Sequence, residues 1–376
     1  MLETPKNIAI IGGGPGGLTL ARLLQIQGAK VKVYERDANK EVRVQGATLD
    51  LHEESGLKAL AEAGLMDAFK DNYRPGAGKM RIVDHKGTIL HDDATDEREE
   101  TRPEIDRGPL RKILLDSLQP ETVVWDSHFK SLVPNGNGWA ITFMNGTSAI
   151  ADLVIAADGA HSKIRPFITP IKAFYSGVTM VEGVVYHSAI QVPSLHQLLN
   201  GGKVFALEGG KTLIVSSKGD GSLVFYTGCK TDEHWCKEID FSDKTQVLHW
   251  FKSTFEGWSE AWLALFDKAS LPFIARPQYC MPLDQTWEAL PNLTMLGDAA
   301  HVMPPFAGEG VNMAMLDALK LSECLAKYPS AAEAIAHYEK EMRQRASATA
   351  RDTLDQTELM HTADGLKNML EMFAGH

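Results

Sequence analysis

The chain has 376 residues, 44% of them apolar, and 49 acidic against 38 basic side chains give it a formal charge of −11. This length supports two or three units around substantial cores, and the acidic balance argues against nucleic acid as a partner, so we expect a monomer that binds a small molecule. The absence of a long apolar run, of a signal-peptide pattern and of paired cysteine spacing predicts a cytoplasmic protein with no membrane partner, disulfide or metal site.

The chain begins with the pattern of a strand, a helix and a second strand. Residues 7–11 are apolar and β-branched without alternation, as in a parallel strand that is covered on both faces. Residues 15–27 have apolar side chains at helical spacing, with a proline at the start and Gly28 as the stop signal. Residues 31–35 form the next strand. This order predicts a βαβ unit.

Gly12, Gly14 and Gly17 fit the G-x-G-x-x-G pattern between the first strand and the first helix. Such glycines give a tight turn, admit a pyrophosphate and let the helix pack closely on the strand, and the helix N-terminus attracts phosphate. Glu35 ends the second strand, where a carboxylate can accept hydrogen bonds from ribose. Because FAD and NAD both contain ADP, this turn alone leaves the choice between them open.

The remaining pattern predicts an α/β fold in which a Rossmann-like cofactor-binding domain is discontinuous in sequence. Its first part covers residues 1–170, with helices expected at 53–70 and 107–118 and strands at 123–125, 140–143 and 152–157. A β-rich substrate domain is expected at 171–272, the second part of the cofactor domain at 273–328, and a C-terminal helical segment at 329–376.

A second glycine-rich motif lies almost three hundred residues after the first. Residues 297–312 read GDAAHVMPPFAGEGVN, and a helix is expected from Gly310 onward. Glycines just before that helix allow its N–H groups to face a flavin ring where negative charge accumulates on reduction. The motif strongly resembles the second FAD motif of the single-component aromatic hydroxylase class of flavin monooxygenases. The resemblance implies cofactor contacts from Asp298, Pro305, Gly308, Gly310, Val311 and Asn312.

Other segments resemble the same class in the same order. The sequence DGAHSKIR from Asp158 to Arg165 is similar to its middle Asp-Gly motif, which serves both FAD and NAD(P)H. The resemblance further implies cofactor contacts from Arg36, Arg43, Asp50 and Arg107, the last of these near the FAD phosphates. His301 has no partner predicted from sequence, and we expect it to be a packing or hydrogen-bonding residue.

Within the class, the segments YERD at 34–37, GATLDLH at 46–52 and ADLVI at 151–155 look like the tetracycline-inactivating flavin monooxygenases. Members of that family hold the drug with an amide, an arginine and a histidine on the β-rich domain. The corresponding positions here carry Glu182, Lys203 and Val224, so the polar contacts differ. The predicted substrate-binding residues are Glu182, Lys203, Val224, Pro305, Phe306 and Gly308.

The sequence therefore predicts an FAD-dependent monooxygenase that consumes NAD(P)H and O₂ and oxidises an electron-rich aromatic or enolic compound, with tetracycline-like polycycles among the candidates. The flavin carries the chemistry, so no protein residue is predicted to be catalytic. No second G-x-G-x-x-G turn follows a strand, which favours transient NADPH or NADH. A flavin-dependent dehydrogenase or oxidase and a non-catalytic flavoprotein are the alternatives; the Trp-x-Trp-x-Ile-Pro signature of flavin-dependent halogenases is absent.

Overall fold

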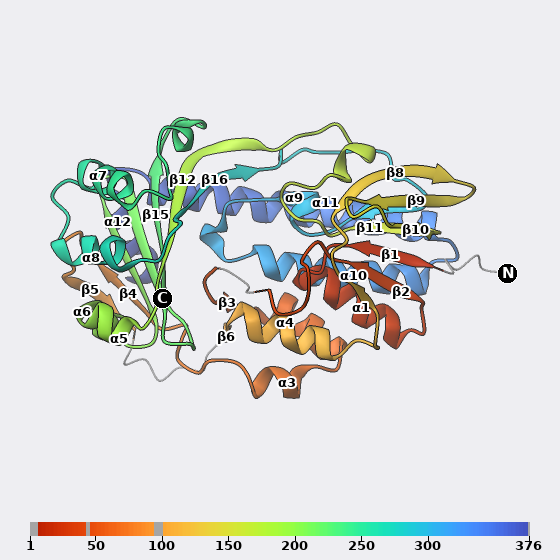
Figure 1. The fold of residues 1–376 in the computed structure, drawn as a ribbon, viewed down its shortest axis with the longest axis horizontal. Helices are drawn as coiled ribbons and strands as arrows, with labels where there is room; N and C mark the ends of the chain where they lie inside the picture. The colour runs from red at the N-terminus through yellow and green to blue at the C-terminus, as the bar shows by residue number, and fades with distance from the viewer. Residues whose placement is uncertain (1–6, 43–45, 94–100, 375–376) are drawn as a thin grey trace.

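The computed structural model describes residues 7–42, 46–93 and 101–374, so the predicted cofactor residue Arg43 lies outside the described residues. Two main sheets stand side by side, a parallel sheet around β1 and β2 and a mixed sheet around β12 and β15 (Figure 1). The predicted α/β class, with a cofactor-binding layer and a β-rich unit, is confirmed.

The parallel sheet has the order β17-β11-β1-β2-β7 among the described residues. Its strands are β1 (Ile8–Ile11), β2 (Val31–Tyr34), β7 (Val123–Val124), β11 (Leu153–Ala156) and β17 (Leu293–Met295). β1, β11 and β17 are buried throughout, and β1 and β11 have the unbroken apolar sequences that predict this. Because β17 comes from the second half of the chain, the predicted discontinuity of this layer is also confirmed.

Helices on the parallel sheet follow the sequence pattern closely in three cases and not in a fourth. α1 (Pro15–Ile26), α4 (Arg107–Asp116) and α10 (Gly310–Lys327) match the expected positions. The helix expected over 53–70 is instead a π-helical turn (Glu53–Leu57), α2 (Lys58–Glu62) and α3 (Met66–Lys70). Gly64, with φ +70°, ends α2 because its left-handed backbone cannot continue an α-helix.

Smaller strands lie beside the parallel sheet. β8 (Phe129–Asn135), β9 (Gly138–Phe143) and β10 (Ser148–Ala151) form one antiparallel group, and β3 (Leu49–Asp50) pairs with β6 (Glu104–Ile105). Short helical turns follow at Arg165–Phe167, Trp235–Lys237 and Pro305–Ala307, together with α9 (Asp298–His301).

The mixed sheet has the order β16-β12-β15-β14-β13-β4-β5 within the described residues. Its strands are β4 (Met80–Val83), β5 (Ile89–Asp92), β12 (Phe174–Val185), β13 (Lys203–Glu208), β14 (Lys211–Ser217), β15 (Leu223–Lys230) and β16 (Ile274–Cys280). β4 pairs in parallel with β13, so the sheet takes strands from outside the segment 171–272 that the sequence predicts for it. The division at residues 170, 272 and 328 stays a prediction.

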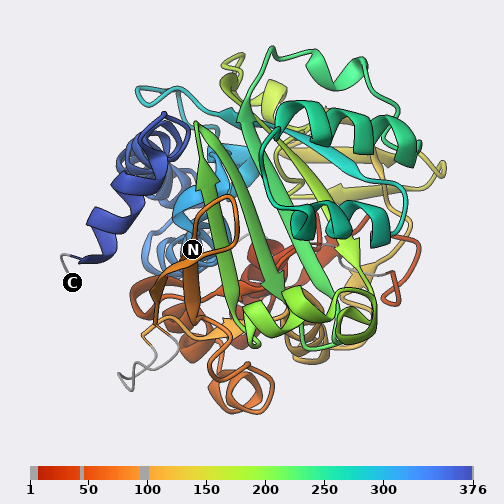
Figure 2. The same cartoon turned by 90° about the vertical axis from the view of Figure 1, so that its left-hand side faces the viewer.

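Helices cover one face of the mixed sheet, which we call the covered face. Val181, Val215 and Phe225 on that face pack into an apolar core with side chains of α7 (Lys244–Thr254) and α8 (Glu260–Lys268). Figure 2 shows these helices lying over the strands. α5 (Ser188–Gln191) and α6 (Pro193–Leu199) complete the layer. The alternate residues, including Glu182 and Tyr226, form the opposite face, which we call the inner face.

Two helices end the chain, and the first of them connects both sheets. α11 (Ala331–Met360) has 30 residues and α12 (Gly365–Ala374) follows it. Tyr338 donates to Met295 O of the parallel sheet at 3.1 Å, whereas Glu358 accepts from Lys230 of the mixed sheet at 2.6 Å. In the described part of the chain, no helix is both long and apolar enough to cross a membrane.

Candidate active site

The first glycine turn is shaped by backbone contacts at two glycines and is open at the third. A Cβ on Gly12 would lie 2.2 Å from Ala157 O, and a Cβ on Gly17 would lie 2.2 Å from Gly12 O. Gly12 also has φ +112°, which L side chains rarely adopt. By contrast, a Cβ on Gly14 would have no neighbour within 4 Å. The turn is therefore tightly packed on the sheet side and accessible on its outer side.

Glu35 lies directly under this turn and is buried, at 8% exposure. Its Oε2 accepts the N–H of Gly13 at 2.5 Å, and its Oε1 accepts the N–H of Asp37 at 2.9 Å. Each carboxylate oxygen can accept more than one hydrogen bond. The side chain is thus held where the sequence places a ribose contact, and it also braces the turn.

The three predicted motifs meet at the carboxyl end of the parallel sheet. Gly12 follows β1, Glu35 follows β2, Asp158 follows β11 and Asp298 follows β17. These strands are neighbours in the order β17-β11-β1-β2, so the four residues lie along one edge. In open α/β sheets ligands bind outside this edge. A Cβ on Gly16 of α1 would also lie 2.9 Å from Ala314 O of α10, which places the two glycine-rich turns side by side.

The two aspartates at this edge are closely surrounded by protein. Burial raises the pKa of Asp298, while the charges of His301 and Arg107 act in the opposite direction. By accessible area, however, Asp298 is exposed. A side chain on the wall of a recess has both properties. Burial also raises the pKa of Asp158, whose Oδ2 accepts from the N–H of Lys163 at 2.8 Å and whose Oδ1 is buried without a hydrogen-bond partner.

The second glycine-rich segment forms the start of α10 beside Asp298. Gly308 has φ +72°, and a Cβ there would lie 3.0 Å from Asp50 Oδ1. A Cβ on Gly310 would meet only Asp298 Oδ1, at 3.9 Å, so the first turn of α10 is open toward that carboxylate. Asn312 is fully buried and donates to Asp50 O at 2.9 Å, which fixes β3 against α10.

His52 links the same two segments through charge. Its Nε2 lies 3.1 Å from Asp50 Oδ2, and its Nδ1 lies 3.3 Å from Glu309 Oε1. The contact between His52 and Glu309 has the distance of an ion pair but not the geometry of a hydrogen bond, so these two groups attract each other through their charges. Burial alone would lower the pKa of His52, but Asp50 and Glu309 outweigh it and raise the pKa to about 9. An imidazolium therefore holds β3 to the start of α10.

His301 has a buried partner that the sequence did not indicate. Its Nε2 lies 2.6 Å from Asp317 Oδ2 of α10, while Asp317 also accepts from Gly297 N at 3.0 Å and from Arg345 of α11 at 2.7 Å. The charge of Asp317 outweighs burial and raises the pKa of His301. His301 is thus a buried, hydrogen-bonded residue, as predicted, and it fixes the segment that carries Asp298.

Arg107 and Tyr226 connect the recess to the mixed sheet through the backbone of one residue, Ala47. Arg107 Nε donates to Ala47 O at 3.0 Å, and the N–H of Ala47 donates to the Tyr226 hydroxyl at 2.9 Å. Burial lowers the pKa of Arg107, whereas Asp298 and Glu182 act to raise it. Burial raises the pKa of Tyr226 to about 12, with a further contribution from Glu182. Hydrogen bonds thus join Arg107 to Tyr226 of the inner face, and Asp298 and Glu182 act on Arg107 through their charges.

The three predicted substrate residues of the β-rich unit share the inner face but differ in their surroundings. Glu182 is 2% exposed, and its Oε2 accepts from Arg276 at 2.5 Å. Lys203 forms an ion pair with the buried Glu104 of β6. Val224 is fully buried, and its apolar side chain forms no hydrogen bond. Of the three, only Glu182 has a polar partner from the same sheet. This partner, Arg276, is 42% exposed.

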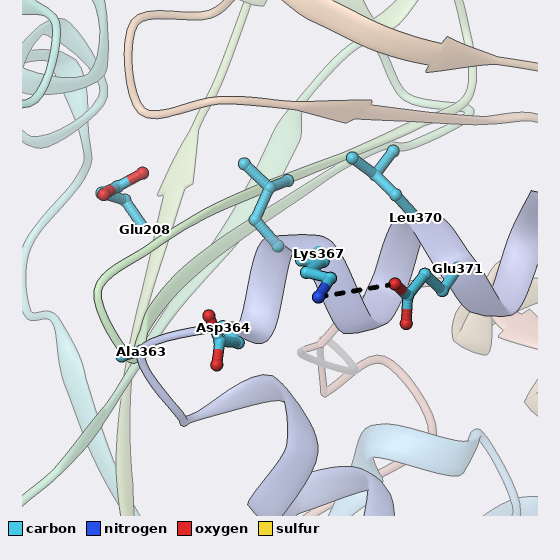
Figure 3. A pocket seen from close by; sticks show the side chains of 7 residues that line it. Glu208, Ala363, Asp364, Lys367, Leu370 and Glu371 are labelled. Carbon is cyan, nitrogen blue, oxygen red and sulfur yellow. Dashed lines mark ion pairs between the residues drawn. The ribbon is translucent and has the colours of Figure 1, made fainter.

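The other predicted residues lie at the rim. Pro305 is exposed, and the half-buried Phe306 packs against an apolar cluster that includes Phe205 and Ile214 of the inner face. Arg36 is exposed next to Glu35. A separate surface cavity, beside α12, is drawn in Figure 3. The described residues that line it include none of the predicted site residues, so it is not part of this site.

Sequence analysis missed several residues that shape the site. Tyr226, Glu309, Asp317 and Arg345 each act on a residue far away in sequence, and no local pattern marks them. Arg165, within the Asp-Gly motif, is buried and donates to Ala299 O and Ala300 O, so it supports α9.

Comparison with known proteins agrees with this geometry. The family described as FAD binding domain matches residues 6–235 and 290–353. Monooxygenase asqM of Emericella nidulans is 30% identical over 375 residues, which cover 85% of this chain and 84% of the relative. The 3-amino-4-hydroxybenzoate 2-monooxygenase of Streptomyces cremeus is 27% identical, with 97% of this chain and 90% of the relative covered.

Among solved structures, tetracycline destructase Tet(55) superposes with a TM-score of 0.80 at 20% identity, covering 100% of this chain and 96% of that one. This level of identity shows a shared fold. The match of the family over more than half of the chain, together with the asqM similarity, confirms the resemblance that the glycine-rich and Asp-Gly motifs indicate. The chain therefore belongs to the FAD binding domain family and is an FAD-dependent monooxygenase.

Proposed function

We propose that this enzyme consumes NAD(P)H and inserts one atom of O₂ into an electron-rich aromatic or enolic small molecule. The observation that carries the proposal is the hydrogen-bonded path from Arg107 through the backbone of Ala47 to Tyr226, because the charges of Asp298 and Glu182 also act on Arg107. One end of this path has the chemistry of a dinucleotide site, and the other end is an independent sheet face. A cofactor and a substrate can thus meet between the two sheets.

The residues present fit FAD. The open Gly14 and the N-terminus of α1 suit the pyrophosphate, Glu35 suits the ribose of the adenosine half, and Asp298 suits a ribityl hydroxyl. The open first turn of α10, at Gly310, Val311 and Asn312, would present N–H groups to the flavin ring. Bound FAD supplies hydride acceptance and oxygen activation, which no protein side chain provides.

The chain's own side chains orient the cofactor and the substrate and exclude water from them. Arg107 is half-buried and its positive charge acts on Asp298, so it would stabilise negative charge on the bound cofactor. Phe306 and the apolar inner-face residues Phe205 and Ile214 belong to one apolar cluster, which forms a wall beside the proposed substrate position. Such a wall limits access of water to the reacting atoms.

The substrate class is supported from two sides. An apolar wall with a few polar groups suits a planar organic molecule, and the Streptomyces relative is named for an aromatic amino-hydroxy acid substrate. Tetracycline-like polycycles stay among the candidates. The buried Val224 and the ion-paired Lys203 differ from the family's drug-binding groups, which makes simpler ring compounds the better match.

NADPH or NADH is proposed as a transient co-substrate because the sequence has only one G-x-G-x-x-G turn after a strand. A cytoplasmic monomer that binds a small molecule rather than nucleic acid or membrane stays a prediction. The four cysteines, all among the described residues, are free thiols, which supports a reducing compartment.

The central test is whether the purified protein carries FAD and transfers oxygen. We expect a flavin absorption spectrum, NADPH oxidation in air that a substrate accelerates, and incorporation of one ¹⁸O atom from ¹⁸O₂ into the product. A product without labelled oxygen would support a dehydrogenase or oxidase instead. A protein that cannot be reconstituted with FAD would reject the cofactor assignment.

Asp298→Ala tests the second motif directly. We expect it to lose most of its FAD on gel filtration because the ribityl contact disappears, whereas Asp284→Ala, at an exposed aspartate in a neighbouring loop, should retain FAD. Fluorescence titration of the apoprotein with FAD measures the difference. Equal affinities in the two variants would remove Asp298 from the cofactor site.

A further inference from the structure

Glu182 and Tyr226 stand directly opposite each other on neighbouring strands of the inner face. β12 and β15 are antiparallel, and their register pairs Glu182 with Tyr226. Opposed side chains in such a pair have Cβ atoms about 5 Å apart and point to the same side. The alternate residues, Val181 and Phe225, lie in the core of the covered face, so both polar side chains are directed toward the cofactor recess.

Each of the two side chains uses one hydrogen-bonding position within the protein and has a second one without a partner among the described residues. Glu182 Oε2 accepts from Arg276, and no other hydrogen bond reaches this carboxylate from the described residues. The Tyr226 oxygen accepts the N–H of Ala47, but the described residues offer its hydroxyl proton no acceptor. The pair thus presents one strong acceptor and one donor, and each side chain is fixed by its other contact.

The surroundings keep these roles fixed. Burial and the neighbouring Glu182 raise the pKa of Tyr226 to about 12, so the hydroxyl keeps its proton at neutral pH. The guanidinium of Arg276 is the counter-charge of Glu182 and lies at the partly exposed rim. A buried carboxylate acceptor beside a half-buried hydroxyl donor discriminates against ligands that leave either one unpaired.

We propose that Glu182 and Tyr226 recognise one edge of the substrate, on which an N–H group stands next to a carbonyl, as in a cyclic amide. The N–H donates to Glu182 Oε1, and the carbonyl accepts from the Tyr226 hydroxyl. This inference rests on the proposed function and names its substrate class, an electron-rich ring lactam. Tyr226 is a specificity-determining residue that the sequence did not indicate.

The test uses 4-hydroxy-2(1H)-quinolinone and its N-methyl derivative, in which a methyl group replaces the N–H donor. Calorimetric titration of the FAD-loaded protein, without NADPH, gives the two dissociation constants. We expect the N–H compound to bind at least about tenfold more tightly, since a hydrogen bond to a charged acceptor is lost on methylation. Equal affinities, or no binding of either compound, would overturn the proposal.

Two variants separate the two contacts. Glu182→Leu should bring the ratio of the two dissociation constants close to one, because it removes the acceptor that reads the N–H. Tyr226→Phe should weaken both compounds by a similar factor of about five or more, because both keep the carbonyl. A ratio that survives Glu182→Leu, or a Tyr226→Phe variant with unchanged affinities, would contradict the assigned roles.

Matched controls come from the same sheet. Glu208→Leu removes an exposed carboxylate at the end of β13, and Tyr175→Phe removes a hydroxyl that bonds to Thr179 and Thr231. Both should leave the dissociation constants unchanged. If Glu182→Leu does not fold, Glu182→Gln keeps the shape with a weaker acceptor and should still reduce the ratio severalfold.

Binding and turnover are measured separately, so the two proposals fail in different ways. Normal affinity differences without NADPH oxidation would reject the redox function and retain the lactam site. Substrate-stimulated NADPH oxidation and ¹⁸O incorporation with other ring compounds, without discrimination between the two quinolinones, would reject the lactam site and retain the monooxygenase.

Discussion

The two sheets of this protein place their chemistry in different positions. The parallel sheet is buried on both faces, so its polar groups, such as Glu35, Asp158 and Asp298, follow the ends of strands. The mixed sheet is covered by α7 and α8 on one face, whereas α12 packs on only part of the other face, where polar groups such as Glu182 and Tyr226 lie. A ligand can therefore bind at the edge of one sheet and against the surface of the other.

This comparison predicts that the covered face contributes stability rather than specificity. Phe225 is fully buried there and stacks edge-on against Phe266, with ring centroids 4.9 Å apart. Phe225→Ala should reduce the free energy of unfolding by about 3 to 5 kcal/mol. Urea denaturation measures this, and the FAD affinity of the folded fraction should be unchanged. A large loss of FAD affinity would show that the two faces are not independent.

Within the first glycine turn of the parallel sheet, one glycine should matter for stability and another for cofactor binding. Gly12→Ala forces a Cβ to 2.2 Å from Ala157 O at a positive φ, so it should cost about 2 to 5 kcal/mol of stability. Gly14→Ala, with open space around the new Cβ, should fold normally and bind FAD weakly. Denaturation and FAD titration of both variants check this. Normal FAD binding by Gly14→Ala would contradict a pyrophosphate site at this turn.

The link between β3 and α10 should depend on pH. The pKa of His52 is about 9 in the folded protein, above its ordinary value of about 6.5. Its contribution is therefore complete below pH 6.5 and is lost as the pH rises through 9. The difference in unfolding free energy between wild type and His52→Gln should fall from about 2 kcal/mol at pH 6 to near zero at pH 10.

Several other charges face His52, and they determine the control. Asp50 and Glu309 contact the ring, Arg102 lies 3.9 Å from Asp50, and Lys203 also acts on Asp50. Urea titrations at each pH should include His85→Gln, which removes a half-exposed histidine from the mixed sheet. A similar pH dependence in both variants would exclude a special role for His52.

The smallest effect is expected at the exposed ion pair between the mixed sheet and α11. Lys230 and Glu358 are 48% and 65% exposed, so Glu358→Gln should change the unfolding free energy by less than about 1 kcal/mol. The change should shrink further in 0.5 M salt. An effect of several kcal/mol would mean that α11 depends on this contact rather than on its buried ones.

The sequence predicted the parallel sheet well because its signals are local. A buried strand, a glycine turn and a helix occupy about twenty consecutive residues. Gly17 is required by its contact with Gly12 O within that unit, and Gly12 is favoured by its positive φ. The segment from Asp298 to Asn312 carries an equally compact pattern. Where the chemistry depends on a turn and the helix after it, a single sequence therefore suffices.

The mixed sheet was less predictable because its pairings are distant in sequence. β4 joins β13 across more than a hundred residues, and the partner of Glu182 on the neighbouring strand follows only from the register. The same holds for His52, whose second carboxylate, Glu309, comes from α10. Residue types at single positions do not specify such contacts, so Tyr226 and Glu309 carried no visible signal.

The long helix α11 has a consequence for how the molecule comes apart. Glu339 bonds Thr294 next to the cofactor edge, Arg345 bonds Asp317, and the following His361 packs against Phe306 and reaches Thr212 of the mixed sheet. One rigid rod is thus fastened to both layers along its length. We therefore expect neither layer to unfold on its own, and heating should produce one cooperative transition. A truncated chain that lacks α11 should not fold stably.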